Sequence, residues 1–247
     1  MELHGGGTSR ARLKLSPARS SRLSSRAMNC IVTAGPTYES LDAVRRLTNF
    51  STGKLGTQLA NFLADRGHDV TLLIGYYATH HEAVRAKTVT TYTTTTDLRD
   101  RLHALSGGKI DAVFHAAAVS DFQFGKIWER NDAGALTELT GGKLSTRAGT
   151  LLAELVPTPK ILAGLRTLYP HACLVGWKYE VDGDQTSVIS KARQQLADCH
   201  TDACVANGKA YGPGFGVVTG DKVTHFGDVA DLYVALENLL QRGRMNP

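Results

Sequence analysis

The 247-residue sequence lacks the features that mark membrane, secreted and metal-binding proteins. No apolar run approaches the length of a membrane-spanning helix, and no stretch resembles a secretory signal. The four cysteines show no Cys-x-x-Cys spacing, and three of them lie in or beside apolar stretches. We interpret them as small buried hydrophobes in a reducing compartment. These absences predict a cytoplasmic protein that does not bind membranes.

The excess of positive charge is confined to the start of the chain. Residues 1–27 hold six of the 28 basic residues and one of the 23 acidic residues, which leaves 22 of each sign in the rest. A formally neutral body argues against a broad nucleic-acid surface. The Arg-, Ser- and Gly-rich segment 1–27 predicts a disordered basic leader. An organelle transit peptide and a start codon misassigned upstream of Met28 are the alternatives.

Two common nucleotide-binding fingerprints are also missing. A Walker A motif would need Gly at position 48 and Ser or Thr at position 55, where Thr48 and Leu55 stand. The Gly-Pro-Thr segment at residues 35–37 does not continue as Gly-x-Gly-x-x-Gly. The sequence therefore excludes a P-loop and the usual dinucleotide loop.

Strand-like and helix-like segments alternate from residue 29 onward. Strands are predicted at residues 29–34, 69–75, 87–91, 111–117, 172–179 and 203–206, and helices at 53–67, 95–106, 159–168, 186–196 and 228–240. This rhythm predicts an α/β fold with a Rossmann-like, open, mostly parallel sheet and helices on both faces, as one domain over residues 28–247. Gly220 and Asp221 predict a small hairpin. Residues 123–150, with little periodicity, predict a protruding arm.

A phosphate-binding pocket is predicted where the first strand leads into the first helix. The loop at residues 35–37 follows the strand, and Ser51, Thr52, Gly53 and Lys54 open the helix. Backbone N–H groups and the helix dipole at such an N-terminus favour a phosphate. The alternative is that Ser51, Thr52 and Gly53 merely cap the helix.

Asp121 and Lys143 are charged candidates elsewhere in the chain. An apolar strand ends in three alanines at residues 116–118, which would let a flat base or a phosphate approach the backbone, and Asp121 follows. Asp121 is a candidate for binding a ribose hydroxyl or Mg²⁺, or else a turn residue. Lys143, in the predicted arm, is a candidate cationic finger for a triphosphate, or else a solvated surface lysine.

Two more predicted strands end in polar or aromatic residues. Trp177 is a candidate contact for a nucleobase and Lys178 for a phosphate, the alternative being a core Trp and a surface Lys. Asn207 ends the next strand. The alanine-rich strand is similar to one in short-chain dehydrogenases, yet no Tyr in the chain is followed four residues later by Lys. A nicotinamide- or flavin-dependent Rossmann reductase is therefore the alternative function.

Taken together, these segments resemble the phosphopantothenate–cysteine ligase family, in its monofunctional form, over nearly all of residues 29–240. The matching motifs occur in the family's order: Ala34-Gly35-Pro36-Thr37, Asp42-x-Val44-Arg45, Thr48-Asn49-x-Ser51-Thr52-Gly53-Lys54-x-Gly56, Ala117-Ala118-Val119-Ser120-Asp121-Phe122, Lys143-Leu144-Ser145-Thr146, Thr158-Pro159-Lys160-Ile161-Leu162, Gly176-Trp177-Lys178 and Ala206-Asn207. Such ordered matches make the resemblance specific.

The resemblance implies a ligase of coenzyme A biosynthesis. Family members join 4′-phosphopantothenate to cysteine through an acyl-nucleotide, converting a nucleoside triphosphate to monophosphate and pyrophosphate. The resemblance implies CTP rather than ATP as co-substrate, Mg²⁺ as cofactor, and a homodimer in which the arm of one subunit reaches the other. Because only the short leader precedes Met28, it implies no flavin, and a separate phosphopantothenoylcysteine decarboxylase as pathway partner.

The resemblance also implies roles for individual residues. Asn49 and Lys143 would be catalytic, with Asn49 also contacting the substrate. The remaining candidates would bind the nucleotide (Gly35, Pro36, Thr37, Ser51, Ala118, Asp121, Phe122, Trp177 and Lys178) or the substrate (Thr52, Gly53, Lys54 and Asn207), with Asp121 near the metal. Trp177 stands where the family usually has Phe.

Overall fold

The computed structural model describes Met1, residues 26–145 and residues 149–242. The predicted leader at residues 1–27 lies almost entirely outside this part of the chain. None of the helices within it combines the length and apolar character that crossing a bilayer requires.

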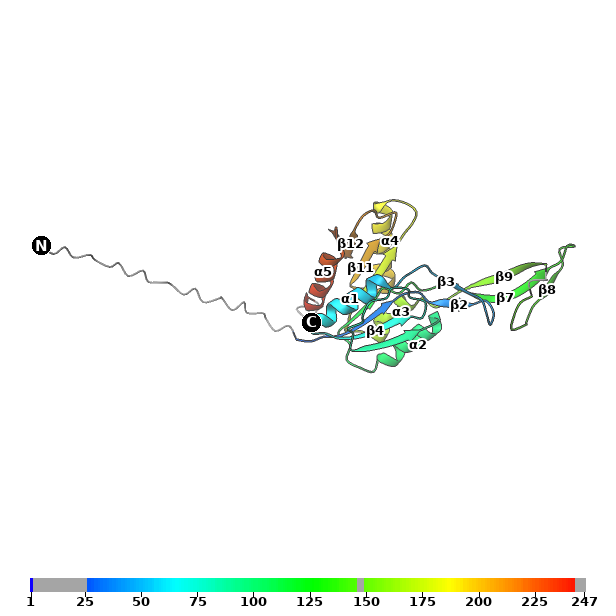
Figure 1. Ribbon diagram of the computed structural model, residues 1–247. Helices are drawn as coiled ribbons and strands as arrows, with labels where there is room; N and C mark the ends of the chain where they lie inside the picture. Colours follow the sequence, from blue (N-terminus) through cyan, green and yellow to red (C-terminus); the bar gives the residue numbers. More distant parts are fainter. Residues whose placement is uncertain (2–25, 146–148, 243–247) are drawn as a thin grey trace.

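An eight-stranded sheet forms the centre of the protein (Figure 1). Its order is β13-β12-β11-β10-β6-β1-β4-β5, and the six strands from β11 to β5 run parallel. The parallel strands are β1 (Asn29–Ala34), β4 (Asp69–Gly75), β5 (Thr88–Tyr92), β6 (Ala112–His115), β10 (Cys173–Tyr179) and β11 (Ala203–Asn207). The predicted hairpin is present as β12 (Phe215–Thr219) and β13 (Lys222–Phe226), which pair antiparallel at the edge.

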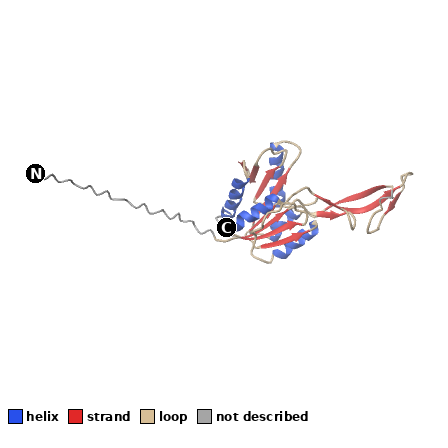
Figure 2. Ribbon diagram, viewed as in Figure 1, coloured by secondary structure: helices blue, strands red, loops and turns tan. Residues whose placement is uncertain are grey.

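In the part of the chain that the structure describes, five helices cover both faces of the sheet (Figure 2). They are α1 (Lys54–Asp65), α2 (Thr95–Leu105), α3 (Ile161–Leu168), α4 (Gln185–Cys199) and α5 (Val229–Arg242). Side chains alternate between faces along a strand, so Val32 packs with the α1 and α5 core while Ile31 packs with the α2 and α3 core. A third cluster joins α4 to β11 and β12. The predicted fold class is confirmed.

The order in which the chain adds strands to the sheet reverses between β1 and β6. From β1 the chain adds β4 and β5 on one side, then crosses to β6 and continues through β10 and β11 on the other. In open α/β sheets, ligands bind beyond the carboxyl ends of the strands at such a switch point. The loops that follow β1 and β6 are therefore the first place to look for a site.

The arm contains strands that the sequence pattern did not reveal, and it extends to residue 157, beyond the predicted end at residue 150. β7 (Phe122–Arg130), β8 (Leu136–Glu138) and β9 (Thr150–Pro157) form a separate antiparallel sheet that protrudes from the domain (Figure 1). A second unpredicted element, the hairpin of β2 (Tyr38–Ser40) and β3 (Arg46–Thr48), contacts β7 through β2. Both elements are largely exposed. They bury no regular apolar face that would produce a clear alternation.

The end of β4 packs so closely on the loop after β1 that residue 75 must be glycine. A Cβ added to Gly75 would lie 2.2 Å from the backbone oxygen of Pro36, whereas one added to Gly107 would meet nothing within 4 Å. We expect Gly75→Ala to lower the free energy of unfolding by about 1–3 kcal/mol, as other overpacking changes do. Gly107→Ala is the matched control and should not lower it. Urea unfolding measures both, and equal stability of the two variants would contradict the close packing.

Candidate active site

The loops after β1 and β6 are joined by backbone hydrogen bonds. The N–H of Thr37 donates to the oxygen of Ala118 at 3.1 Å, and the N–H of Ala118 donates to the oxygen of Gly35 at 2.9 Å. Pro36 and Ala118 form an isolated parallel bridge. Predicted site residues from two distant segments thus lie side by side at the switch point.

Asn49 joins the same cluster from the loop after β3. Its side-chain Nδ2 donates to the oxygen of Ala118 at 3.0 Å, although the residue itself is exposed. The hydroxyl of Thr48 donates to the backbone oxygen of Thr37 at 2.9 Å, which fixes the approach of this loop. The amide of Asn49 retains a second N–H and a carbonyl oxygen that a ligand can use.

Thr37 is buried beneath this cluster and supports it through hydrogen bonds. Its side chain has no exposed surface, and its Oγ1 accepts a hydrogen bond from the N–H of Ser120 at 2.8 Å. The same oxygen lies 3.2 Å from the hydroxyl of Ser120 and 3.3 Å from that of Thr95. Thr37 therefore holds the loop after β6 in place, and its side chain has no surface with which to contact a nucleotide.

The N-terminus of α1 is open. Gly53 is the N-cap residue, in the left-handed conformation with φ of 79°, and no side chain caps the helix. The hydroxyl of Thr52 accepts a 3.3 Å hydrogen bond from the N–H of Lys54, and Ser51 makes no side-chain cap. The capping alternative thus holds for Gly53 but does not account for Ser51. The first-turn N–H groups, with the positive end of the helix dipole, are suited to a phosphate.

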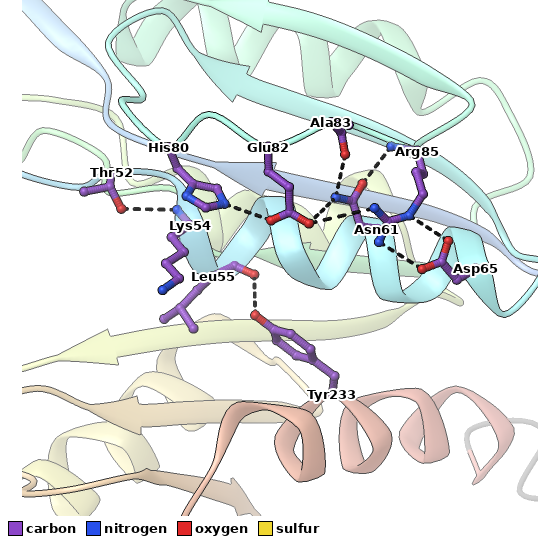
Figure 3. A network of polar contacts seen from close by, with 10 residues as sticks. All are labelled: Thr52, Lys54, Leu55, Asn61, Asp65, His80, Glu82, Ala83, Arg85 and Tyr233. Atoms are coloured by element: carbon purple, nitrogen blue, oxygen red, sulfur yellow. Dashed lines mark hydrogen bonds and ion pairs between the residues drawn. The ribbon is translucent and has the colours of Figure 1, made fainter.

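The loop between β4 and β5 braces this helix end (Figure 3). The N–H of His80 donates to the oxygen of Thr52 at 3.0 Å, and the His80 ring lies 2.9 Å from the carboxylate of Glu82. Asn61 of α1, which is 1% exposed, donates to Glu82 at 3.1 Å and accepts from the N–H of Arg85 at 2.7 Å. The hydrogen bond from His80 holds the pKa of Glu82 below its usual value. No motif indicated these contacts, because the side chains that make them are scattered polar residues.

A cleft of about 550 Å³ opens on the other side of the switch point. Strands β6 and β10 and helices α3 and α4 contribute its walls. The predicted residues Asp121, Trp177 and Lys178 line it, together with His115, Ala117, Val119, Ser120, Thr158, Pro159, Lys160, Ile161, Leu162, Ala163, Lys191, Gln194, Gln195, Asp198 and Cys199. Its size suits a small-molecule ligand.

Asp121, the predicted metal ligand, forms an ion pair with Lys160 at the border of this cleft. Both side chains are mostly exposed. Within the described residues no group of three or more His, Cys, Asp or Glu side chains could hold a metal ion. A single carboxylate fits Mg²⁺ that is bound mainly through phosphates and water. Phe122, the next residue, is exposed at the start of β7.

Positive charge around the cleft comes from lysines. Lys178 and Lys191 both lie near Glu180, at 3.3 Å and 2.6 Å, and their hydrogen bonds hold the pKa of Glu180 below its usual value. His115 does not add to this charge, because burial lowers its pKa to about 4. Its Nδ1 lies 3.0 Å from the hydroxyl of Thr33. His115 is therefore neutral near pH 7.

Two buried polar atoms at the ends of β10 and β11 have no hydrogen-bond partner in the described part of the chain. They are Nε1 of Trp177 and Oδ1 of Asn207. The Trp177 side chain packs against the core on the α1 and α5 face of the sheet. Its neighbour Gly176 faces the other side, where an added Cβ would meet Leu162 of α3 and Gln195 of α4. A buried polar atom left unpaired costs about 1–3 kcal/mol. Neither atom is exposed, so neither offers surface to a ligand in this conformation.

Lys143 lies apart from this cleft, in the loop between β8 and β9. The residue is exposed, and none of the arm residues that the structure describes, 122–145 and 149–157, is among those that line the cleft of its own chain. The structure therefore joins the predicted residues of the loops after β1, β3 and β6 and places Asp121, Trp177 and Lys178 on the cleft, whereas the predicted catalytic lysine lies on the arm.

Comparison with known proteins identifies the family. The model of the DNA/pantothenate metabolism flavoprotein C-terminal domain matches residues 26–230. The chain is 35% identical over 187 residues to the coenzyme A biosynthesis bifunctional protein CoaBC of Thermococcus kodakarensis, and 31% identical over 199 residues to that of Bacillus subtilis. These alignments cover 74% and 80% of this chain but 42% and 45% of the relatives, so the chain spans less than half of their length.

Solved structures show the same fold. A DNA/pantothenate metabolism flavoprotein from Streptococcus pneumoniae superposes with a TM-score of 0.76 at 24% identity, over 87% of this chain and 99% of that one. A Cab2 mutant in complex with phosphopantothenate-cysteine superposes with a TM-score of 0.67 at 16% identity, over 88% and 87%. Since the family model spans most of the sequence, the family that the motifs indicated is confirmed: the chain belongs to the DNA/pantothenate metabolism flavoprotein C-terminal domain family.

Proposed function

We propose that this protein is a phosphopantothenate–cysteine ligase, which joins 4′-phosphopantothenate to cysteine with a nucleoside triphosphate. The observation that carries the proposal is the cluster at the switch point. There the loops after β1 and β6 and the amide of Asn49 meet at Ala118, and both the open N-terminus of α1 and the 550 Å³ cleft border these loops. The relatives from Thermococcus kodakarensis and Bacillus subtilis are named as coenzyme A biosynthesis proteins.

The proposed chemistry has two steps. The carboxylate of phosphopantothenate attacks the α-phosphate of the triphosphate, and pyrophosphate leaves. The amine of cysteine then attacks the acyl carbonyl, forming the amide, losing a proton and releasing the nucleoside monophosphate. Both steps build negative charge on oxygen atoms, so the protein has to position the reactants and stabilise that charge.

The described residues divide these tasks. Ser51, Thr52, Gly53 and Lys54 present the N-terminus of α1 to a phosphate. Asn49 offers its amide to the acyl group or to the pantothenoyl amide. The backbone at Gly35, Pro36 and Ala118 lines the nucleotide with Phe122, Trp177 and Lys178, and Asn207 contributes to substrate binding from the end of β11. Thr37 supports this loop from beneath.

The proposal includes CTP and Mg²⁺. CTP is preferred over ATP because the resemblance links bacterial members to CTP, and the curated relatives named above are archaeal and bacterial. Asp121 would hold Mg²⁺, which when bound neutralises charge on the triphosphate. Lys160 forms an ion pair with Asp121. It belongs to the matching motif at residues 158–162, but the resemblance implied no role for it.

The reductase alternative is not favoured. The glycine fingerprint of dinucleotide-binding folds is absent after β1, where Gly35 is followed by Pro36 and Thr37. The Tyr and Lys pair of short-chain dehydrogenases is absent as well.

A homodimer completes the proposed site. The arm carries Lys143 away from the cleft of its own chain, and the arm and the β2–β3 hairpin expose the apolar side chains of Val44, Leu47, Leu136 and Leu155. A second copy would cover them and receive Lys143 in its cleft. A separate phosphopantothenoylcysteine decarboxylase is the proposed pathway partner.

Pyrophosphate release tests the activity directly. We expect release when the protein is incubated with 4′-phosphopantothenate, cysteine, Mg²⁺ and CTP, with less release when ATP replaces CTP. Omitting cysteine should stop continued turnover and leave the acyl-nucleotide bound. If neither nucleotide supports release, the ligase proposal is wrong.

Lys143 should matter for catalysis and not for folding. Lys143→Gln removes one cation from the reacting phosphate, and we expect kcat to fall by about 10²–10³-fold, as with the loss of one transition-state donor. Lys126→Gln is the control within the same arm, since Lys126 only pairs with Glu138 on the surface. Steady-state kinetics and thermal unfolding of both variants are the measurements. Equal kcat values would remove Lys143 from the mechanism.

Mixing two inactive variants tests whether Lys143 serves the partner subunit. Asn49→Ala and Lys143→Gln chains are unfolded together and refolded at equal amounts. Random pairing gives half mixed dimers with one complete site each, so roughly a quarter of wild-type activity should return. No gain over the separate variants would mean that Asn49 and Lys143 act within one chain.

A further inference from the structure

The turn between β2 and β3 holds the segment that carries Lys143. The carboxylate of Asp42 in this turn accepts hydrogen bonds from the N–H groups of Val44 at 2.9 Å and Arg45 at 2.8 Å. Its second oxygen accepts from Nε of Arg45 at 3.0 Å and from the N–H of Leu144 at 3.1 Å. The last bond spans from the turn to the arm.

Two further hydrogen bonds connect the same pair of segments. Arg45 donates through Nη2 to the oxygen of Leu144 at 2.8 Å, and the N–H of Ala43 donates to the oxygen of Gly142 at 3.0 Å. The residues on both sides of Lys143 are thus tied to the turn. Leu144 is buried against it, whereas Lys143 remains exposed.

Asp42 is well suited to this task because it stays ionised. Its side chain is 2% exposed although it lies in a surface turn. The Arg45 guanidinium and the surrounding N–H groups hold the pKa of Asp42 well below its usual range. Hydrogen bonds to an ionised acceptor are stronger than bonds between neutral groups.

We propose that Asp42 is a positioning residue for the ligase reaction, acting through Lys143. The catalytic effect of Asp42 rests on the proposed function of Lys143, whereas the hydrogen bond from Leu144 to Asp42 does not depend on that function. Lysine has a flexible side chain, so fixing the backbone on both sides narrows where its ammonium group can reach. A displacement of about 1 Å can lower a rate about 10²-fold. By holding this segment, the ionised Asp42 limits the displacement of the Lys143 ammonium group, whichever subunit's cleft that group enters.

Asp42→Asn tests the proposal, because it keeps the size of the side chain and removes its charge. We expect kcat to fall by about 10–100-fold, the range that misplacement of a catalytic group produces, with KM for each substrate changed by less than about 3-fold. Asp132→Asn, at an exposed aspartate in the same arm, is the matched control and should leave kcat unchanged.

The decisive measurement repeats Asp42→Asn in the Lys143→Gln background. If Asp42 acts through Lys143, the second change should lower kcat by less than about 2-fold, since coupled residues are non-additive. A full additional loss, an unchanged kcat in the single variant, or an effect on KM alone would overturn the proposal. General loss of folded protein also counts against it, because that loss would appear in both backgrounds.

Amide hydrogen exchange separates this inference from the proposed function. Peptides that contain Leu144 should exchange about 10-fold faster in Asp42→Asn, while peptides from β1 and β6 keep wild-type rates. If Lys143→Gln is fully active, the role of Lys143 is wrong even when this exchange result holds. Unchanged exchange at Leu144 would show that Asp42 does not hold the segment.

Discussion

The close pairing of the loops after β1 and β6 is the constraint on which the rest of the site depends. Ala118 exchanges hydrogen bonds with both Gly35 and Thr37. The loop after β1 fits only because β4 ends in Gly75 beneath Pro36. Since the sheet changes direction between these two strands, their pairing places the open helix end, Asn49 and the lysine-rich cleft around one point.

Around that point several polar groups of the protein have no hydrogen-bond partner among the described residues. The N-terminus of α1 has no side-chain cap, and the buried polar atoms of Trp177 and Asn207 lack partners in the described part of the chain. Each of these lowers the stability of the free protein, and the polar network of Thr37 and the brace at Asn61 support the region. Groups that are fixed in advance need no reorganisation when charge develops on a substrate.

The body and the arm divide the work of the proposed reaction. The body offers backbone N–H groups and the cleft, which suit binding and orientation. The arm offers Lys143, whose segment is tied back to the β2–β3 turn by Asp42 and Arg45. These hydrogen bonds fix the backbone on both sides of Lys143, so they define where the arm presents its charge.

The fold class and the family could be predicted from the sequence, which also named the candidate site residues that the proposed function uses. Alternating apolar segments predicted the parallel sheet, since strand and helix periods are local properties, and β1 and β4 have the predicted bounds. The arm strands and the β2–β3 hairpin were not predicted, because exposed strands carry no strong alternation of apolar and polar residues. The folded structure was needed to show that Thr37 is buried, that Lys160 pairs with Asp121, and that Asp42 holds the segment of Lys143. These contacts join residues far apart in the chain, and no local pattern records such a pairing.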